Sequence, residues 1–410
     1  MRKGFDLEGA SDVVVVGGGV AGLGAARELA RRGLGVTVVE GGAAGAASRA
    51  AAGMLAPQAE ADRRDVLFDL LCASRELYPA FAEALREESG VDIELDRTGT
   101  LYLAFTEEDE KELARRFRWQ KEAGLAVERL TAEEARGLEP SISTRVRAAL
   151  LFPRDWQVEN RELVRALSLS ARRHGAVELN DEAARGVRVV AGRAVGVETT
   201  ARFIPAGAVL LAAGAHTSRL PFFFREGEGE RTSVSARDGE SIASHPLIEP
   251  VRGQMLCARQ PDAPAPFVRH VIYSPRGYLV ARRDGRLLAG STSELSGFDC
   301  RVTDEGAREI SLHATEIAPA FNSLERTDSW AGLRPRAEDG LPVLGASADV
   351  EKLFYATGYY RNGILLAPAT GELVAGLIAG GATAGDPRVL EAFSPARFRR
   401  RSALVAAGEG

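Results

Sequence analysis

Cysteine and histidine are scarce in this chain of 410 residues. The three cysteines, Cys72, Cys257 and Cys300, are far apart and form no CxxC pair, and the five histidines are scattered. Neither residue type shows the close spacing that is typical of a zinc site or of a disulfide framework. We therefore expect reduced thiols, a cytoplasmic location, no metal site and no histidine-based catalytic triad.

Long apolar runs and basic clusters are also missing. The chain contains no run of about 18 apolar residues, so we expect no stable membrane insertion. Residues 1–11 carry charges but no apolar core, so we expect no signal peptide. The formal net charge is −5 and the one basic run, 399–401, is short, so we expect no nucleic-acid partner.

A strand, a glycine turn, a helix and a second strand follow one another near the start of the chain. The apolar run Val13–Val16 leads into Gly17-x-Gly19-x-x-Gly22, and the second strand ends at Glu40. The three glycines allow a tight turn, close approach of the backbone to a pyrophosphate, and close helix packing. The pyrophosphate is favoured at the helix N-terminus, and an acid at the position of Glu40 accepts from a ribose 2′-OH and disfavours NADP. This pattern predicts dinucleotide binding.

Strand-like segments of two kinds alternate along the rest of the chain. Further nucleotide-domain strands are expected at 209–211 and 353–356, whereas 99–105, 278–281 and 287–289 are expected in a second sheet. We predict an α/β and mixed fold, with a discontinuous Rossmann-like domain and a mostly antiparallel substrate domain. The predicted boundaries are 1–90, 151–220 and 330–400 for the first domain, and 91–150 and 221–329 for the second. Residues 222–245, which are rich in charge and small polar residues, are predicted to be a solvated surface loop.

The chain contains one GxGxxG pattern, whereas an enzyme that uses both a flavin and NAD(P)H normally needs two nucleotide folds. Residues 358–378 read as a glycine turn that leads into a helix, and a helix N-terminus beside a flavin stabilises negative charge on the reduced ring. This arrangement favours one tightly held FAD that serves as the reaction centre.

Several motifs resemble those of the D-amino-acid-oxidase superfamily, and within it the glycine oxidases of the thiamine-synthesis type. The resemblance covers nearly the whole chain, from about Ser11 to about Phe398. It rests on stretches that read SRAAAGML at 48–55, PVRGQ at 250–254, GSTSE at 290–294, GF at 297–298, WAGLRP at 330–335, DGLP at 339–342 and ATGYYRNGILLAP at 356–368. The resemblance implies a nucleotide-binding domain joined to a second sheet domain.

Three features depart from the family pattern. Tyr359 stands where a histidine is common, Ser293 stands where some glycine oxidases have a methionine close to the substrate, and 222–245 lengthens a connection that is usually short. The first two bear on the size of the preferred substrate, and the third bears on access to the site.

The resemblance also implies the residues of the site. Arg334 matches the arginine that binds the substrate carboxylate, for which the guanidinium fork is well suited. Tyr278 matches a tyrosine that donates to the same carboxylate, and Arg361 follows the glycine turn beside the flavin. The expected FAD-binding residues are Gly17, Gly19, Val20, Ala21, Gly22, Glu40, Ser48, Arg49, Ala52, Gly53, Met54, Val187, Ala213, Gly214, Arg361, Asn362, Gly363, Ile364 and Leu365. No cysteine lies between Asp328 and Pro368, where sarcosine oxidases of the superfamily attach their flavin, so we expect non-covalent FAD.

The implied activity is oxidative deamination of glycine and other small amino acids. A hydride passes from Cα to the flavin, dioxygen reoxidises the flavin with release of hydrogen peroxide, and the imine is hydrolysed or supplied to thiazole synthesis. The main alternative is a D-amino-acid or sarcosine oxidase, or a dehydrogenase that uses another electron acceptor. An RNA-modifying flavoenzyme and a non-catalytic FAD-binding subunit are further alternatives, which the acidic charge and the retention of Arg334 and Tyr278 disfavour. The exact amine stays open, and so does the oligomeric state, with a homo-oligomer as one alternative.

Overall fold

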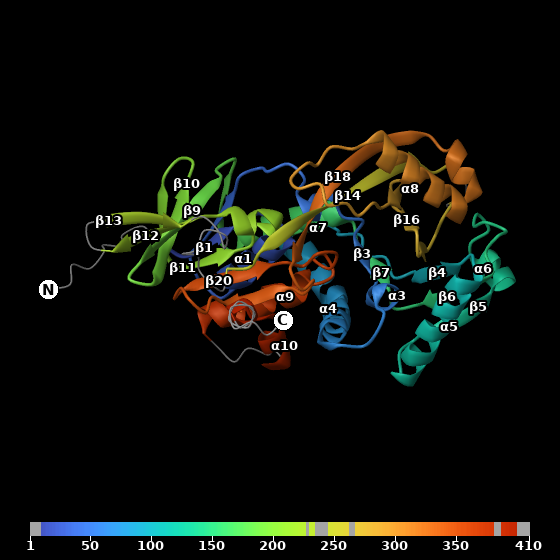
Figure 1. Ribbon diagram of the computed structural model, residues 1–410, viewed down its shortest axis with the longest axis horizontal. Coiled ribbons are helices and arrows are strands. Elements are labelled where there is room, and N and C mark those ends of the chain that lie inside the picture. The colour runs from blue at the N-terminus through green and yellow to red at the C-terminus, as the bar shows by residue number, and fades with distance from the viewer. Residues whose placement is uncertain (1–9, 227–228, 234–244, 262–266, 381–386, 400–410) are drawn as a thin grey trace, which may run out of the picture.

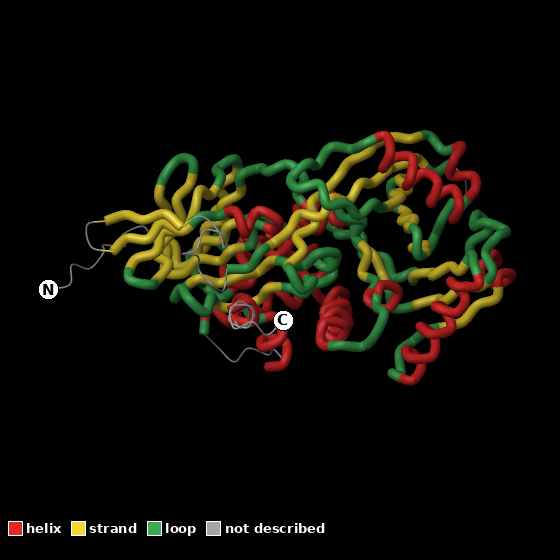
Figure 2. Tube along the Cα trace, viewed as in Figure 1, coloured by secondary structure: helices red, strands yellow, loops and turns green. Residues whose placement is uncertain are grey.

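The computed structural model describes residues 10–226, 229–233, 245–261, 267–380 and 387–399. Two β-sheets, each with its own covering helices, lie at opposite ends of an elongated molecule (Figure 1). Strands accordingly gather at both ends in Figure 2, and helices occupy much of the space between them.

The first sheet has ten strands and a parallel centre. β1 (Ser11–Val16) pairs in parallel with β2 (Val36–Glu40) on one side and with β11 (Phe203–Leu211) on the other. β20 (Leu353–Thr357) pairs in parallel with the second half of β11, so the beginning, middle and end of the chain meet in one sheet. The other strands are β8 (Val177–Asn180), β9 (Ala184–Val190), β10 (Arg193–Thr199), β12 (Phe222–Glu226), β13 (Gly229–Ser233) and β19 (Val343–Ala346).

Both faces of β1 are buried, as its unbroken valine run predicts for a central parallel strand. Val13 and Val15 pack into a core formed with helices, and Val14 and Val16 pack into the core on the other side. The helices of the first core are α1 (Val20–Arg31), α4 (Val66–Ser89), α7 (Asn160–Arg173), α9 (Ala367–Ala379) and the short α10 (Pro387–Phe393).

The second sheet has eight strands in the order β18-β14-β17-β16-β15-β4-β6-β5. Neighbours are antiparallel except for β15 and β4, which are parallel. The strands are β4 (Thr100–Ala104), β5 (Glu128–Thr131), β6 (Ala148–Phe152), β14 (Ile248–Arg259), β15 (Val271–Ser274), β16 (Gly277–Ala281), β17 (Arg286–Gly290) and β18 (Arg326–Ala337). Its helices are α5 (Glu107–Glu122), α6 (Ala132–Leu138), α8 (Asp304–Ile317) and the 3-10 turn η2 (Pro319–Ser323).

Short elements connect the two parts. β3 (Met54–Leu55) and β7 (Trp156–Gln157) pair in an antiparallel two-stranded ribbon. The remaining short elements are α2 (Ala47–Ala50), α3 (Pro57–Glu60) and the 3-10 turn η1 (Gly214–Arg219).

The predicted fold class is confirmed, but sheet membership differs from the predicted segments in three places. The prediction of a loop was wrong for Phe222–Glu226 and Gly229–Ser233, which form an antiparallel hairpin at the edge of the first sheet, with β12 parallel to β9. Residues 234–244 of that predicted loop lie outside the described residues. The predicted boundaries at 150/151 and 329/330 fall inside β6 and β18, both of which belong to the second sheet. Composition alone does not show which distant strand a segment will pair with.

Within the described residues, Cys72, Cys257 and Cys300 are all free thiols. The same part of the chain has no cluster of three or more histidine, cysteine or acidic side chains that could hold a metal ion. None of its helices combines the length and the apolar character that crossing a membrane requires.

Candidate active site

One cavity of about 420 Å³ connects the glycine turn of the first sheet to β14 and β18 of the second. Gly17, Gly19 and Glu40 line one end, and Tyr278 and Arg334 line the other. Most of the predicted dinucleotide-binding and substrate-binding residues therefore face a single space between the two parts of the molecule.

The nucleotide end is built by the turn between β1 and α1. Gly17 has a φ of 114°, which a residue with a side chain rarely adopts. A Cβ on Gly22 would lie 1.9 Å from the Gly17 carbonyl oxygen, so glycine is required there for the helix to pack on the turn. α1 begins after Gly19 without a side-chain cap from that residue, and Val20 and Ala21 of its first turn, where N–H groups lack carbonyl partners within the helix, line the cavity. This turn fits the pyrophosphate of FAD.

Glu40 closes the same end from the tip of β2. One carboxylate oxygen accepts from the Gly18 N–H at 2.6 Å, and the other accepts from the Gly42 N–H at 2.8 Å. These contacts fix the carboxylate against the glycine turn, at the position expected for the acid that accepts from a ribose hydroxyl.

Residues 48–54 form one wall of the cavity. The Ser48 hydroxyl accepts from the Val20 N–H at 3.1 Å and thereby ties this wall to the start of α1. The buried Arg282, which follows β16 of the second sheet, donates to the carbonyl oxygens of Ala52 at 2.7 Å and Val158 at 2.8 Å. Gly53 adopts a φ of 73° and leaves room for both Val158 and Arg282.

Arg334 lies at the other end of the cavity, on β18. Its guanidinium donates to the Thr292 carbonyl oxygen at 3.1 Å and to the Ser291 hydroxyl at 2.7 Å. It rests on Gly253 of β14, where a Cβ would come within 2.2 Å of Nη1. No aspartate or glutamate among the described residues pairs with Arg334, so its positive charge is available to an anionic ligand.

Tyr278 and Arg361 line the same cavity as Arg334, and both contact Tyr273. Tyr278 on β16 is buried, stacks on Tyr273 with ring centroids 6.4 Å apart, and donates its hydroxyl to the Met255 sulfur at 3.2 Å. Arg361 lies 3.4 Å from Glu60 through Nε and donates to the Tyr273 hydroxyl at 3.4 Å. The negative charge of Glu60 raises the pKa of Arg361, and burial raises the pKa of Tyr273 to about 12.

The turn after β20 supports another wall of the cavity. Gly363 and Ile364 line the cavity, and the Tyr360 backbone N–H donates to the Pro335 carbonyl oxygen at 2.7 Å. The Tyr78 hydroxyl donates to the carbonyl oxygen of Ile364, and the Ser74 hydroxyl donates to that of Leu365 at 2.7 Å. Helix α4 thereby holds this turn in place.

The cavity brings together most of the predicted residues. Those that line it are Gly17, Gly19, Val20, Ala21, Glu40, Ser48, Ala52, Gly53, Met54, Ala213, Gly214, Tyr278, Arg334, Arg361, Gly363 and Ile364.

Five predicted residues lie outside its lining. Gly22 is packed against the turn, and Asn362 and Leu365 lie within the supporting loop. Arg49 is exposed and lines a neighbouring surface hollow. Val187 is fully buried in the core of the first sheet, and the cavity is lined instead by the nearby residues 183–185.

Several lining residues were not predicted. His216 and Arg219 from η1 line the cavity and contact the ring of Phe298, with the His216 and Phe298 ring centroids 4.8 Å apart. Glu60, Met255 and Tyr360 also line it. Gly253 lines the cavity as well, and it could have been found because it belongs to the PVRGQ motif. The other residues reach the site through contacts between distant segments and carry no local sequence pattern.

Comparisons with known proteins agree with this geometry. The family described as DAO, FAD dependent oxidoreductase, matches residues 12–377. A glycine oxidase of Geobacillus kaustophilus (strain HTA426) is 38% identical over 378 residues, which cover 92% of this chain and 94% of that protein. The crystal structure of glycine oxidase from G. kaustophilus has a TM-score of 0.85 at 37% identity, and the match covers 95% of this chain and 99% of that chain. The bifunctional protein ThiO/ThiG of Trichormus variabilis (strain ATCC 29413 / PCC 7937) is 33% identical over 397 residues, which cover 96% of this chain and 56% of that protein.

Proposed function

Because the chain belongs to the DAO family of FAD-dependent oxidoreductases, we propose that it oxidises glycine and other small amino acids at the Cα–N bond. The proposal follows the activity that the names of its relatives state. The geometry of the cavity supports it independently.

The observation that carries the proposal is the environment of Arg334. Its guanidinium faces the cavity that begins at the dinucleotide turn, and two neutral oxygens hold it without cancelling its charge. An arginine held in this way suits a carboxylate, because its fork forms two parallel charge-assisted hydrogen bonds. Every α-amino acid carries that carboxylate next to the carbon to be oxidised.

Tyr278 and Arg361 complete the proposed substrate pocket. The Tyr278 hydroxyl now donates to a thioether sulfur, a weak acceptor, so it can redirect to a substrate carboxylate at little cost. Arg361 adds positive charge on the side of Glu60. The bulky Tyr273 contacts both of these residues and the bulky Tyr360 lines the same cavity, which favours a small substrate.

Bound FAD would supply the hydride acceptor for this reaction. The chain's own contribution is to hold the substrate carboxylate on Arg334 and Tyr278 so that the Cα–H bond faces the flavin position beside residues 52–54 and 363–364. Such positioning lowers the barrier because the reacting atoms are held in near-attack geometry.

We further propose that dioxygen is the electron acceptor, that hydrogen peroxide is a product, and that the imine of glycine feeds thiazole formation. The link to thiazole rests on the similarity to the bifunctional ThiO/ThiG proteins. The test is a peroxide assay of the purified protein with glycine, sarcosine, D-alanine, D-proline, L-alanine and a large D-amino acid under one set of conditions. We expect glycine and sarcosine to give the highest kcat/KM, and L-alanine to give none. If a large D-amino acid has a kcat/KM about tenfold above that of glycine, a gap of roughly 1.4 kcal/mol, D-amino-acid oxidation would take the place of glycine oxidation as the proposed function.

A broader amine oxidase or dehydrogenase is the second candidate function. The exposed Ser293 side chain contacts the Tyr360 hydroxyl at 3.3 Å, and serine at this position fills less space than methionine. Two solved neighbours act on secondary amines by their names, an L-proline dehydrogenase and an iminodiacetate oxidase, at 26% and 27% identity. Fast reduction of an artificial dye with little peroxide release would favour the dehydrogenase.

We propose that FAD is held without a covalent bond. Cys72, Cys257 and Cys300 are absent from the residues that line the cavity, although Cys300 packs next to Gly45 on its wall. Heat or acid denaturation of the yellow protein should therefore release free FAD into the supernatant. Flavin that stays with the precipitated chain would contradict this proposal.

A further inference from the structure

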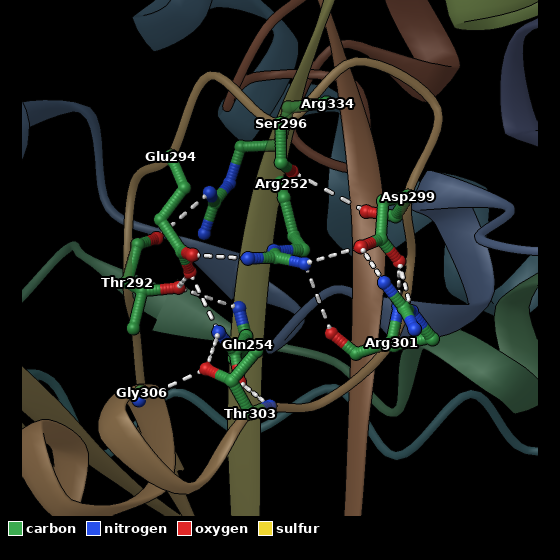
Figure 3. Close-up of polar contacts among 10 residues, drawn as sticks. All are labelled: Arg252, Gln254, Thr292, Glu294, Ser296, Asp299, Arg301, Thr303, Gly306 and Arg334. Atoms are coloured by element: carbon green, nitrogen blue, oxygen red, sulfur yellow. Dashed lines mark hydrogen bonds and ion pairs between the residues drawn. The ribbon is translucent and has the colours of Figure 1, made fainter.

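A polar network behind Arg334 holds the loop that supports it (Figure 3). The loop runs from residue 291 to residue 303, between β17 and α8. It supplies both oxygens that accept from Arg334, the Ser291 hydroxyl and the Thr292 carbonyl. The position of the loop therefore sets the position of the guanidinium.

Arg252 on β14 lies at the centre of this network and is buried. It pairs with Glu294 at 2.5 Å and with Asp299 at 3.4 Å, and it donates to the Arg301 carbonyl oxygen at 3.2 Å. Its backbone also exchanges two hydrogen bonds with Glu294. One side chain thus holds both halves of the loop, as Figure 3 shows.

Glu294 is the acidic residue of the network that is connected to Arg334 through a single residue, Thr292. Thr292 connects them, because its carbonyl accepts from Arg334 and its hydroxyl donates to Glu294 at 2.5 Å. Gln254 donates to the same carboxylate at 2.7 Å. Burial favours the neutral form, but the hydrogen bonds from Arg252, Thr292 and Gln254 outweigh it and lower the pKa of Glu294.

We propose that Arg252 is a positioning residue that keeps Arg334 available to the substrate by holding the Glu294 carboxylate away from it. This inference rests on the proposed function, since it assumes that Arg334 binds the substrate carboxylate. An ionised glutamate that is connected through the single residue Thr292 to an arginine without an acidic partner is a competitor for that arginine. Pairing with Arg252 satisfies Glu294 and removes the competition.

The proposal predicts that two substitutions will compensate each other. In Arg252→Met, Glu294 keeps the hydrogen bonds from Thr292 and Gln254 but loses its charged partner and turns to Arg334, so carboxylate ligands bind more weakly. In Glu294→Gln the competing charge is gone. In the double variant nothing competes for Arg334, and binding recovers although the loop has lost more contacts than in either single variant.

The experiment titrates FAD-loaded parent and variants with acetate, which is the carboxylate of glycine without its amine. Binding is read from the change in flavin absorbance, and KM and kcat for glycine are measured alongside. We expect Arg252→Met to raise the acetate Kd tenfold or more, and to raise KM by a larger factor than it lowers kcat. Glu294→Gln should bind acetate at least as tightly as the parent, and the double variant should return to within threefold of Glu294→Gln.

One control variant and three contradicting outcomes make the experiment decisive. Arg301→Met removes an exposed arginine that pairs with Asp299 on the same loop, and it should leave the acetate Kd within threefold of the parent. A double variant as weak as Arg252→Met overturns the inference, because purely structural damage would accumulate. If Arg252→Met does not fold, a tenfold loss of acetate affinity in Glu294→Gln alone overturns it. Acetate binding that survives Arg334→Ala would instead overturn the proposed anchor, and this inference with it.

Discussion

At the scale of single residues, substrate binding is proposed to depend on Arg334. Replacing it with alanine should leave FAD bound but lower kcat/KM for glycine by roughly 30- to several-thousand-fold, equivalent to about 2–5 kcal/mol, because the carboxylate loses its charge-assisted partner. Lysine should restore only part of the activity, since one ammonium group cannot bind Thr292, Ser291 and a carboxylate in fork geometry. The matched control is Arg336→Ala, which removes a partly exposed arginine of the same strand that pairs with Glu249.

Gly253 is the second residue whose substitution tests the anchor. A methyl group there would come within 2.2 Å of the Arg334 guanidinium, so Gly253→Ala must displace it. We expect kcat/KM for glycine to fall by roughly 10- to 100-fold, the usual effect of a small misplacement in an active site. Gly137→Ala on α6 is the control, because the added methyl group there meets no atom within 4 Å. Normal kinetics in Gly253→Ala would show that substrate binding does not depend on this pose of Arg334.

At the scale of elements, the turn after β16 connects the second sheet to the wall of the cofactor cavity. Arg282 donates to Ala52 and Val158 and lies 3.1 Å from Glu159, and all of these contacts are buried. Arg282→Met would leave the carbonyl oxygens of Ala52 and Val158 without this donor, at a cost of about 1–3 kcal/mol for each buried acceptor, whereas Glu159 would keep its ion pair with Arg286. We expect a lower midpoint of urea unfolding and weaker retention of FAD on dilution.

The neighbouring Arg283 provides the control for that prediction. It is 56% exposed and pairs at the surface with Asp92 at 3.1 Å. Such pairs contribute little to stability, so Arg283→Met should leave both the unfolding midpoint and FAD retention unchanged. Equal effects of the two substitutions would show that Arg282 has no special role in holding residues 52–54.

Sequence reasoning predicted the elements whose signals are local. The β1–α1–β2 unit follows from its valines and glycines. The hairpin of β12 and β13 was missed because its charged, small residues resemble a loop, and pairing with β9 decides its structure. His216 and Arg219 were missed for the same reason, since only the packing of η1 brings them to the cavity.

At the scale of the whole molecule, the site depends on contacts between segments that are far apart in the chain. Arg334 is held by residues 291–292, and Arg282 by residues 52 and 158. The motifs indicated which residue types take part, and the resemblance indicated their roles. The support given by Arg252, Arg282 and Gly253 became apparent only from the folded structure, because each acts on a partner in another segment.

Global stability should also depend on pH through His245. Its buried ring contacts the Tyr355 hydroxyl at 3.0 Å and the ring of Phe222, with centroids 5.1 Å apart, and Nε2 has no acceptor within the described residues. Burial therefore lowers the pKa of His245 from 6.5 to about 4. Above pH 6.5 neither the folded nor the unfolded chain binds this proton, and the neutral ring contributes fully to the free energy of unfolding. As the pH falls from 6.5 toward 4 the unfolded state binds the proton first, so the contribution is lost.

The measurement is the free energy of unfolding in urea at pH 7.5 and pH 4.5 for the FAD-loaded parent and His245→Gln. We expect the parent to lose about 2–3 kcal/mol more than the variant between these two pH values, because glutamine does not titrate. His313→Gln on α8 serves as the matched control, and it should behave like the parent. Other ionisable groups affect parent and variant alike, so the difference between them isolates His245. Equal pH dependence in parent and variant would mean that the ring is hydrated, or finds an acceptor, when it is protonated.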